Sequence, residues 1–491
     1  MPHRIWIVAL GMMHACHGKE PTTGTPTTII HAQSPPPAAE GAERWNVVVD
    51  IPMQKTELLV DFLPAESGWT GTLGVPAQNV YGVPLTDITY TDTAVNFTLD
   101  KPTMPAANEH YTTARDPAGG TTSTGTMTIH GQSFPVEMQR LEADAPYTPA
   151  LQRPQTPTPP FPYTTREATY TSGDIQRAGI LTLPAGEGPH PSVIIESGSG
   201  PQNRDGALAG HKLFVVLADH LARNGIATLR VDDRGVGDST GSGRDATYTD
   251  LTADLLAGVA WLQDQPEINA AQIGVIGHSQ GGTIGPMAAS QSQSVAFVIM
   301  LCGMGVNGDQ VMYTQKRLIL ESMGVEDPWL EERMVMQRQL LDLVLSNADE
   351  STIRAFLEAN IMVDIAEEDR AQVTPELQEQ LVEMGAQQMT AAPIHSLIHS
   401  KPADYLPAVT VPVLAVFGQR DLQVEPIENE AAVSSLLADN PAVTTWVVPD
   451  MSHNLQETTT GRIEEYGELE ETIRPILLDR LVTWIQEQTK E

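Results

Sequence analysis

Residues 271–290 read AQIGVIGHSQGGTIGPMAAS and contain a G-x-S-x-G pentapeptide at 277–281, with Ser279 at its centre. The apolar run 273–276 before it suits a buried parallel strand, and the small residues after it let a helix pack closely on a sheet. A serine between such elements lies on a sharp turn with its Oγ exposed, and the flanking glycines avoid a Cβ clash there. The stretch predicts an α/β fold with Ser279 as a nucleophile. A glycine-rich turn with an incidental serine is the alternative.

A serine nucleophile needs a base and an orienting acid, and in folds with this turn the chain order is serine, acid, histidine. The acid is expected just after a late strand, and Asp421 follows the apolar run 413–417. The base is expected after the last strand, and His453 follows the run 445–448. We therefore predict that Asp421 orients His453, which accepts the Ser279 proton and later passes it to the leaving group.

Other titratable residues stay open as alternatives for the acid or the base. They are Glu425, Asp450, Asp404, His395 and His399. His278 adjoins the nucleophile, but we expect its side chain to point away from the site and to serve packing or hydrogen bonding.

The oxyanion of a tetrahedral intermediate needs preorganised hydrogen-bond donors. One is expected from the backbone N–H of Gln280, directly after the nucleophile. The other is expected from the glycine-rich loop 196–201, which follows the apolar run 193–195, and we choose the backbone N–H of Ser199. A plain glycine–serine turn is the alternative for this loop.

The region 163–491 alternates strand-like and helix-like segments, which favours a mostly parallel sheet. The expected elements are a strand at 193–196, a helix at 212–224, a strand at 227–231 and a helix at 250–263. Residues 305–400 interrupt this alternation with helical stretches, such as 311–323 and 328–345. We read them as an inserted helical cap above Ser279 that shapes the substrate pocket.

The region 43–145 has a different character and predicts a small all-β domain. Strand-like stretches lie at 45–51, 56–62 and 94–99, and a hairpin is expected at 125–138. The proline-rich stretch 146–162 reads as a linker between the two domains, and residues 18–42 read as a disordered linker.

The first 17 residues resemble a secretory signal peptide, because Arg4 precedes a short apolar run. The pair Ala15-Cys16 resembles a bacterial lipoprotein box, so Cys16 is a candidate for lipidation and membrane anchoring. The expected location is extracytoplasmic: periplasmic, anchored to the cell envelope, or secreted. The apolar run is too short to span a membrane.

Composition excludes some classes of partner. The chain has 491 residues and a formal net charge of −34, from 62 acidic and 28 basic residues. This charge opposes binding to nucleic acid or to anionic membranes. The two cysteines, Cys16 and Cys302, do not suggest a disulfide framework, and Cys302 ends an apolar run and is expected to be a buried strand-end residue.

Five stretches together resemble the α/β-hydrolase superfamily, and most closely bacterial serine esterases with a β domain ahead of the hydrolase domain. These stretches are 198–206, 231–241, 277–281, 418–424 and 451–456. The resemblance implies hydrolysis of a small-molecule carboxylic ester through a serine acyl-enzyme, without metal or cofactor. It also implies that the loop around Asp233 packs beneath the site. The sequence departs from the family at 197–198, where Ser-Gly replaces the commoner His-Gly.

The superfamily also contains acyl-CoA thioesterases and serine aminopeptidases, so an exopeptidase or a thioesterase is the alternative function. An exopeptidase usually holds the free amine of its substrate, and the acidic residues Glu367, Glu368 and Asp369 of the cap are candidates for that role.

Overall fold

The computed structural model describes residues 41–51, 54–66, 68–76, 80–100, 108–116, 120–129, 132–142, 153–367, 370 and 373–490. The signal peptide predicted at 1–17, with Cys16, lies outside these residues. So do all but the last two residues of the linker predicted at 18–42, and the first part of the proline-rich stretch. Within the described chain, no helix combines the length and the apolar character needed to cross a membrane.

The N-terminal part folds as one antiparallel sheet in the order β4-β3-β2-β1-β9-β8-β7-β6-β5. Its strands are β1 (Glu43–Ile51), β2 (Gln54–Ala65), β3 (Gly68–Val75), β4 (Val80–Pro84), β5 (Thr86–Tyr90), β6 (Ala94–Leu99), β7 (Glu109–Arg115), β8 (Thr122–Ile129) and β9 (Gln132–Arg140). The two ends of the sheet approach each other because β3 lies against β5, so the sheet is a nearly closed barrel. Alternate side chains, including those of Trp45, Phe62 and Phe97, fill its core.

The second sheet has the order β10-β11-β15-β12-β16-β17-β18-β19. Its strands are β10 (Thr164–Ser172), β11 (Ile175–Leu183), β12 (His190–Glu196), β15 (Ala227–Val231), β16 (Ile268–His278), β17 (Phe297–Leu301), β18 (Val413–Gly418) and β19 (Val443–Val448). The strands from β15 to β19 in this order run parallel, and β10 and β11 are antiparallel. Every residue of β15, β17 and β18 is buried, as expected for strands covered on both faces.

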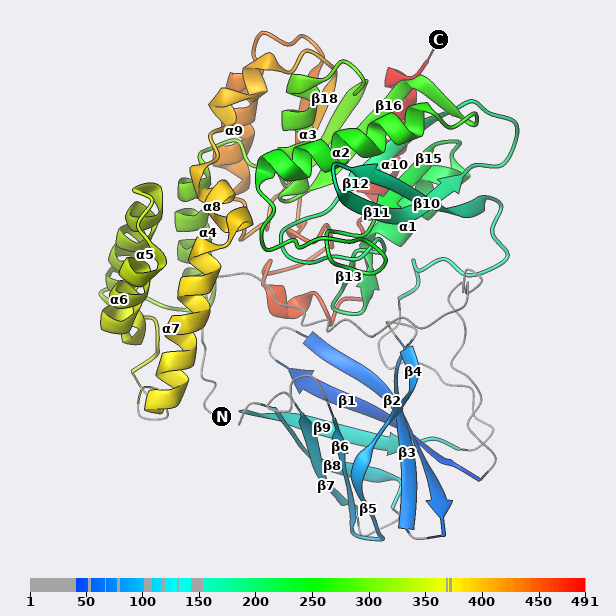
Figure 1. Ribbon diagram of the computed structural model, residues 1–491, viewed down its shortest axis with the longest axis vertical. Helices are drawn as coiled ribbons and strands as arrows, with labels where there is room; N and C mark the ends of the chain where they lie inside the picture. The colour runs from blue at the N-terminus through cyan, green and yellow to red at the C-terminus, as the bar shows by residue number, and fades with distance from the viewer. Residues whose placement is uncertain are drawn as a thin grey trace.

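Helices cover both faces of this sheet (Figure 1). One face packs against α1 (Leu213–Arg223) and α10 (Pro475–Gln488). The other packs against α2 (Tyr248–Gln263), α3 (Gly281–Gln291) and α9 (Pro426–Leu436). A two-stranded ribbon, β13 (Ala207–Leu208) with β14 (His211–Lys212), precedes α1. This arrangement is an α/β-hydrolase fold.

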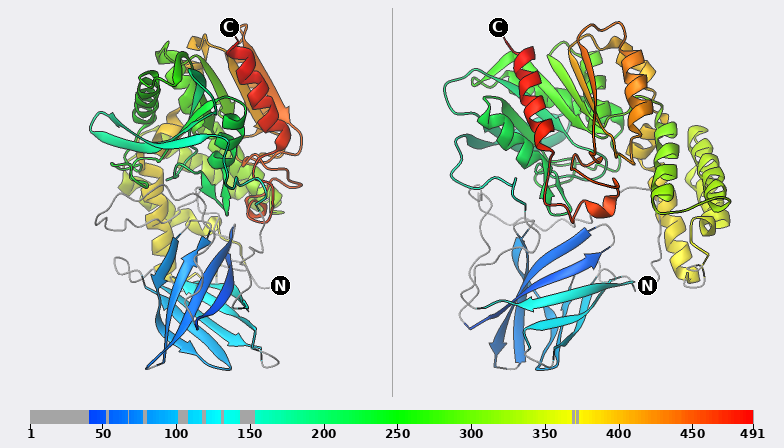
Figure 2. Two further views of the ribbon diagram at one scale, coloured as in Figure 1. Left: turned by 90° about the vertical axis from the view of Figure 1, so that its right-hand side faces the viewer. Right: turned by 180° about the vertical axis from the view of Figure 1, so that it is seen from behind.

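A helical insertion separates β17 from β18 and stands beside the sheet as its own layer (Figures 1 and 2). It contains α4 (Gly308–Ser322), α5 (Trp329–Leu345), α6 (Glu350–Asn360), α7 (Pro375–Thr390) and α8 (Ala392–His399). Its first turn is joined to the sheet domain by Asn429 of α9, whose Oδ1 accepts from the Gly305 N–H at 2.7 Å. The insertion therefore begins close to the carboxyl end of the parallel strands.

The described end of the proline-rich stretch lies against the hydrolase domain. Arg153 donates to the carbonyls of Leu469 and Gly467 at 3.0 and 2.7 Å. Gln155 donates to the Ile473 carbonyl at 2.6 Å and accepts from the Ile473 N–H at 2.9 Å. These bonds fix where the chain enters the second domain, beside the segment that follows His453.

Candidate active site

Ser279 lies on the turn between β16 and α3 with a left-handed backbone, at φ +55°. A Cβ on Gly277 would lie 1.9 Å from the Gly281 carbonyl oxygen, and a Cβ on Gly281 would lie 2.2 Å from that of Glu196. The Ser279 N–H donates to the Leu301 carbonyl at 2.8 Å, which ties the turn to β17. Only glycine fits on either side of so tight a turn, and the strained serine is held by its neighbours.

Three side chains that the sequence singled out meet at the carboxyl ends of the strands. Ser279 Oγ lies 2.9 Å from His453 Nε2. On the other side of the ring, His453 Nδ1 lies 2.7 Å from Asp421 Oδ2. Asp421 and His453 are both buried. The chain order and the contacts are those of a nucleophile, a base and an orienting acid.

Asp421 is held by the loop that follows β18. Its Oδ1 accepts backbone N–H bonds from Gln423 at 2.7 Å and Val424 at 2.9 Å, which leaves Oδ2 directed at His453. The carboxylate orientation is therefore set by backbone, before any contact with the imidazole.

The loop predicted to supply an oxyanion donor lies against the nucleophile. A Cβ placed on Gly198 would lie 3.3 Å from Ser279 Cβ. The next residue, Ser199, is half-buried. Asp233 braces the loop, because its Oδ1 accepts from Ser197 Oγ at 2.7 Å and its Oδ2 from the Gln202 N–H at 2.8 Å. The roles of the Ser199 and Gln280 N–H groups stay a prediction.

Residues 141–446 match the family profile of X-Pro dipeptidyl-peptidase (S15 family). This stretch is well over half of the chain. The chain belongs to the S15 peptidase family. The matched stretch of this S15 hydrolase contains Ser279 and Asp421 and ends before His453.

The S15 hydrolase is also 26% identical over 275 residues to "Esterase EstD" of Thermotoga maritima. That match covers 56% of this chain and 57% of the relative, so the chain spans little more than half of that protein's length.

Two solved structures resemble it weakly. They are the Pyrococcus furiosus esterase Pf2001 (TM-score 0.38, 16% identity, 66% of this chain and 93% of that chain) and the α/β hydrolase GrgF from Penicillium sp. sh18 (TM-score 0.42, 16% identity, 66% and 99%).

The alternative acids and bases of this S15 hydrolase have other partners. Glu425 caps α9 by accepting from the Glu428 N–H at 2.6 Å, and Asp450 pairs with Arg420 at 3.3 Å. His395 contacts Asn347 Oδ1 at 3.0 Å in the helical insertion. His399 contacts the carbonyl of His395 at 2.9 Å, and Asp404 is exposed before β18. None of these five contacts Ser279 in the described structure.

His278 has the hydrogen-bonding role expected of it, but the expectation that its side chain points away from the site is wrong, because its partner is His453. Its Nε2 lies 2.8 Å from the backbone carbonyl oxygen of His453, and the two rings are 5.2 Å apart. Burial, followed by the nearby His453, lowers the pKa of His278 to about 4. The ring is therefore neutral at neutral pH and can donate only through Nε2–H to that carbonyl.

A buried group of charges lies beside the loop predicted to supply an oxyanion donor, to which Asp233 is bonded. Arg177 and Arg234 both pair with Asp254, a carboxylate that is almost fully buried. Burial raises the pKa of Glu196, the last residue of β12, to about 8, and raises that of Asp233 to about 6. Two acids with raised pKa values therefore lie beside the turn at Ser279, since the Glu196 carbonyl faces Gly281 and Asp233 binds Ser197.

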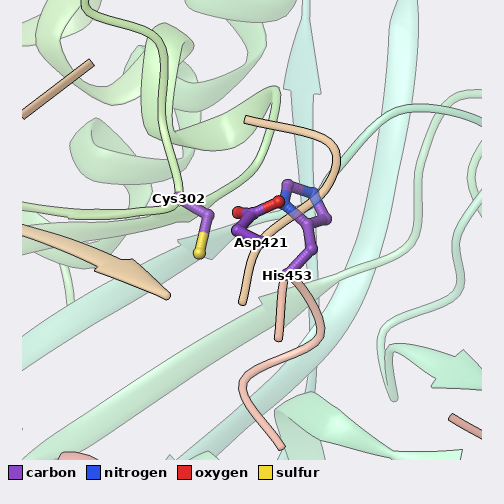
Figure 3. Close-up of side chains that lie close together, drawn as sticks. All are labelled: Cys302, Asp421 and His453. Carbon is purple, nitrogen blue, oxygen red and sulfur yellow. The ribbon is translucent and has the colours of Figure 1, made fainter. Parts of the chain in front are cut away.

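Cys302 is buried at the end of β17, as the sequence predicts. Figure 3 shows its thiol beside Asp421 and His453, with one ligand atom from each of the three residues within 4.8 Å of one another. That spacing can suit a metal ion, but His453 Nδ1 and Asp421 already share a hydrogen bond at 2.7 Å. A cation here would have to break the contact that orients the imidazole, so the geometry favours a hydrogen-bonded acid.

Three contacts of the site were not anticipated from sequence. They are the bonds of Asp233 to the oxyanion loop, the bond of His278 to the His453 carbonyl, and the approach of Cys302 to Asp421. Asp233 had a partial signal, because the stretch 231–241 carries the family resemblance. The other two join residues more than 100 positions apart, and no local pattern marks such pairs.

Proposed function

We propose that this S15-family protein is a serine carboxylesterase that hydrolyses small carboxylic esters with short acyl chains. The observation that carries the proposal is the continuous line of contacts from Ser279 Oγ through the His453 ring to Asp421 Oδ2. The esterase relative at 26% identity supports the reaction class.

In the proposed mechanism, His453 Nε2 takes the Ser279 proton while Oγ attacks the ester carbonyl carbon. The tetrahedral oxyanion accepts hydrogen bonds from the Gln280 and Ser199 N–H groups. The imidazolium, stabilised by Asp421, then protonates the leaving alkoxide, and the acyl group stays on Ser279. Water deprotonated by His453 attacks this acyl-enzyme, which releases the carboxylic acid and restores the serine.

The experiment is hydrolysis of p-nitrophenyl acetate by Ser279→Ala. Loss of the nucleophile should reduce kcat by about 10⁴-fold or more, with an unchanged circular-dichroism spectrum and melting temperature. Ser290→Ala is the matched control, because Ser290 lies on the helix that follows Ser279 and its hydroxyl donates to the Met287 carbonyl at 2.8 Å. Undiminished turnover by Ser279→Ala would reject the proposal.

An exopeptidase is the second candidate, and the X-Pro dipeptidyl-peptidase family match favours it. Of the acids considered for holding a free amine, Glu367 is exposed, and Glu368 and Asp369 lie outside the described residues. A panel of p-nitrophenyl esters, acyl-CoA thioesters and dipeptidyl anilides with proline next to the anilide separates the candidates. A higher kcat/KM on the anilide than on every ester would favour the peptidase. A higher kcat/KM on the acyl-CoA thioester than on every ester would favour the thioesterase.

We also propose an extracytoplasmic location, with Cys16 as the point of lipid attachment. The support is the apolar run after Arg4 and the Ala15-Cys16 pair. Cell fractionation and mass spectrometry of the mature N-terminus test it. A protein found in the cytoplasm with Met1 or Pro2 at its N-terminus would contradict the proposal.

A further inference from the structure

Cys302 is placed by both neighbouring strands. It follows the last residue of β17 with a left-handed backbone, at φ +54°, and is completely buried. Its N–H donates to the Val416 carbonyl of β18 at 2.7 Å, and β18 leads into the loop that holds Asp421. This left-handed turn ends the extended course of β17. Figure 3 shows the Cys302 side chain beside Asp421.

The thiol lies beside the Asp421 carboxylate: Cys302 Sγ, one Asp421 oxygen and one ring nitrogen of His453 are all within 4.8 Å of one another. Burial, then the charge of Asp421 and the hydrogen bond to it, raise the pKa of Cys302 well above its usual value. A thiol that keeps its proton beside a carboxylate can only donate. Asp421 accepts backbone N–H groups on Oδ1 and contacts the His453 ring with Oδ2, and the Cys302 thiol is a further donor beside it.

We propose that Cys302 is a positioning residue, whose S–H donates to the Asp421 carboxylate and keeps Oδ2 aligned with His453 Nδ1. The inference rests on the proposed function and adds a fourth member to its site. The thiol does two things there. It fixes the carboxylate together with the Gln423 and Val424 N–H groups, and it withdraws part of the negative charge that acts on the imidazole.

Two other titratable groups face this cluster. His278 of β16 has a pKa lowered to about 4 by burial, and Tyr466, from the segment after His453, has its pKa raised by burial. Both are uncharged between pH 5 and 9. Glu196 and Asp233 also titrate in this range, in the parent and in the variants alike, so a difference between their pH profiles reports on the Asp421–His453 pair.

Removing the S–H leaves the carboxylate with one donor fewer. The Asp421 charge would then stabilise the His453 imidazolium more strongly. This protonated form, which cannot accept the serine proton, would persist to higher pH. The acid limb of kcat/KM should therefore move to higher pH. Looser alignment should lower kcat and leave KM nearly unchanged, because Cys302 does not touch the substrate.

The test compares Cys302→Ser, which keeps a donor, with Cys302→Ala and Cys302→Val, which do not. We expect kcat on p-nitrophenyl acetate to fall on the order of tenfold in the Ala and Val variants. The pKa that defines the acid limb of their kcat/KM profile should rise by about half a unit or more. The loss of a single charge-assisted hydrogen bond corresponds to a shift of about one pKa unit. The Ser variant should stay within about threefold of the parent, with the parent's acid limb.

Val298→Ala is the matched control, because Val298 is a fully buried residue of the same strand. It should lower the melting temperature without moving the acid limb. The proposal is overturned if the Ala and Val variants keep the parent kcat and acid limb. It is also overturned if the Ser variant loses as much as the Ala variant, since volume rather than the donor would then matter. Failure of the proposed function would show separately, as full activity of Ser279→Ala.

Discussion

His278 Nε2 lies 2.8 Å from the backbone carbonyl oxygen of His453, so the residue before Ser279 holds the residue that we propose as its base. This bond joins the turn at Ser279 to the loop that carries His453 and sets the position of that loop. The bond needs a neutral His278 that carries its proton on Nε2, which the lowered pKa of about 4 provides.

Replacing His278 by alanine should therefore displace the His453 loop. We expect kcat for ester hydrolysis to fall by about tenfold, with little change in KM, because the cost is one buried hydrogen bond at the base. His278→Gln is the control, since its amide nitrogen can donate from nearly the same place. Equal losses in the two variants would show that the ring, and not its hydrogen bond, matters.

Gly277→Ala should disrupt the turn itself. The new Cβ would lie 1.9 Å from the Gly281 carbonyl oxygen. Neither atom can move away without a shift of the backbone, because the backbone fixes the position of both. We expect loss of soluble protein or a fall of several degrees in melting temperature, together with loss of activity. Gly243→Ala, whose Cβ would meet only Arg234 O at 3.4 Å, should stay near the parent in both measurements. A fully active, stable Gly277→Ala would contradict the geometry of the turn.

Asp233→Asn should weaken the oxyanion loop. An amide cannot accept at both ends, so either the Ser197 hydroxyl or the Gln202 N–H loses its acceptor. We expect kcat to fall by about tenfold while KM changes little, because the loop acts on the transition state. Asp238→Asn is the control, as Asp238 lies in the same segment but is exposed. A change confined to KM would point instead to substrate binding.

Glu196 should make stability depend on pH in a defined direction. Its pKa is about 8 when folded, against 4.5 for an exposed glutamate, because burial disfavours the charge. Below pH 4.5 the carboxyl is protonated in both states. Between pH 4.5 and 8 only the unfolded state has released the proton, so stability falls as pH rises, and the loss is complete once the folded carboxyl also ionises above pH 8.

Glu196→Gln removes that penalty. Its free energy of unfolding should exceed that of the parent by about 2–4 kcal/mol above pH 8, and the difference should vanish towards pH 4.5. Chemical denaturation across pH 4.5–9 measures it, with the exposed Glu187→Gln as control. A gain that is the same at every pH would rule out titration of Glu196 as its cause.

The three residues of the candidate triad could be predicted because each follows a recognisable strand in a fixed chain order. The strand before Ser279 was also foreseeable, although β16 begins at Ile268, ahead of the apolar run at 273–276. Residues 269–272, which precede that run, are partly or fully exposed, so hydropathy did not mark them as strand.

The contacts around the triad were less predictable. Cys302 reads as a buried apolar residue, and nothing in its neighbourhood shows that a left-handed turn directs it at Asp421. Such contacts arise from the order in which parallel strands are laid side by side. Here β17 lies between β16 and β18, so the residue that follows β17 can reach the acid in the loop that follows β18.

The central claim is that Ser279 is the nucleophile activated by His453 and Asp421. Labelling with a fluorophosphonate, followed by peptide mass spectrometry, tests it most directly. We predict a single phosphonyl adduct on the peptide that contains Ser279, formed much more slowly in His453→Ala and Asp421→Asn and absent in Ser279→Ala. An adduct on another residue, or equal labelling of Ser279→Ala, would contradict the claim.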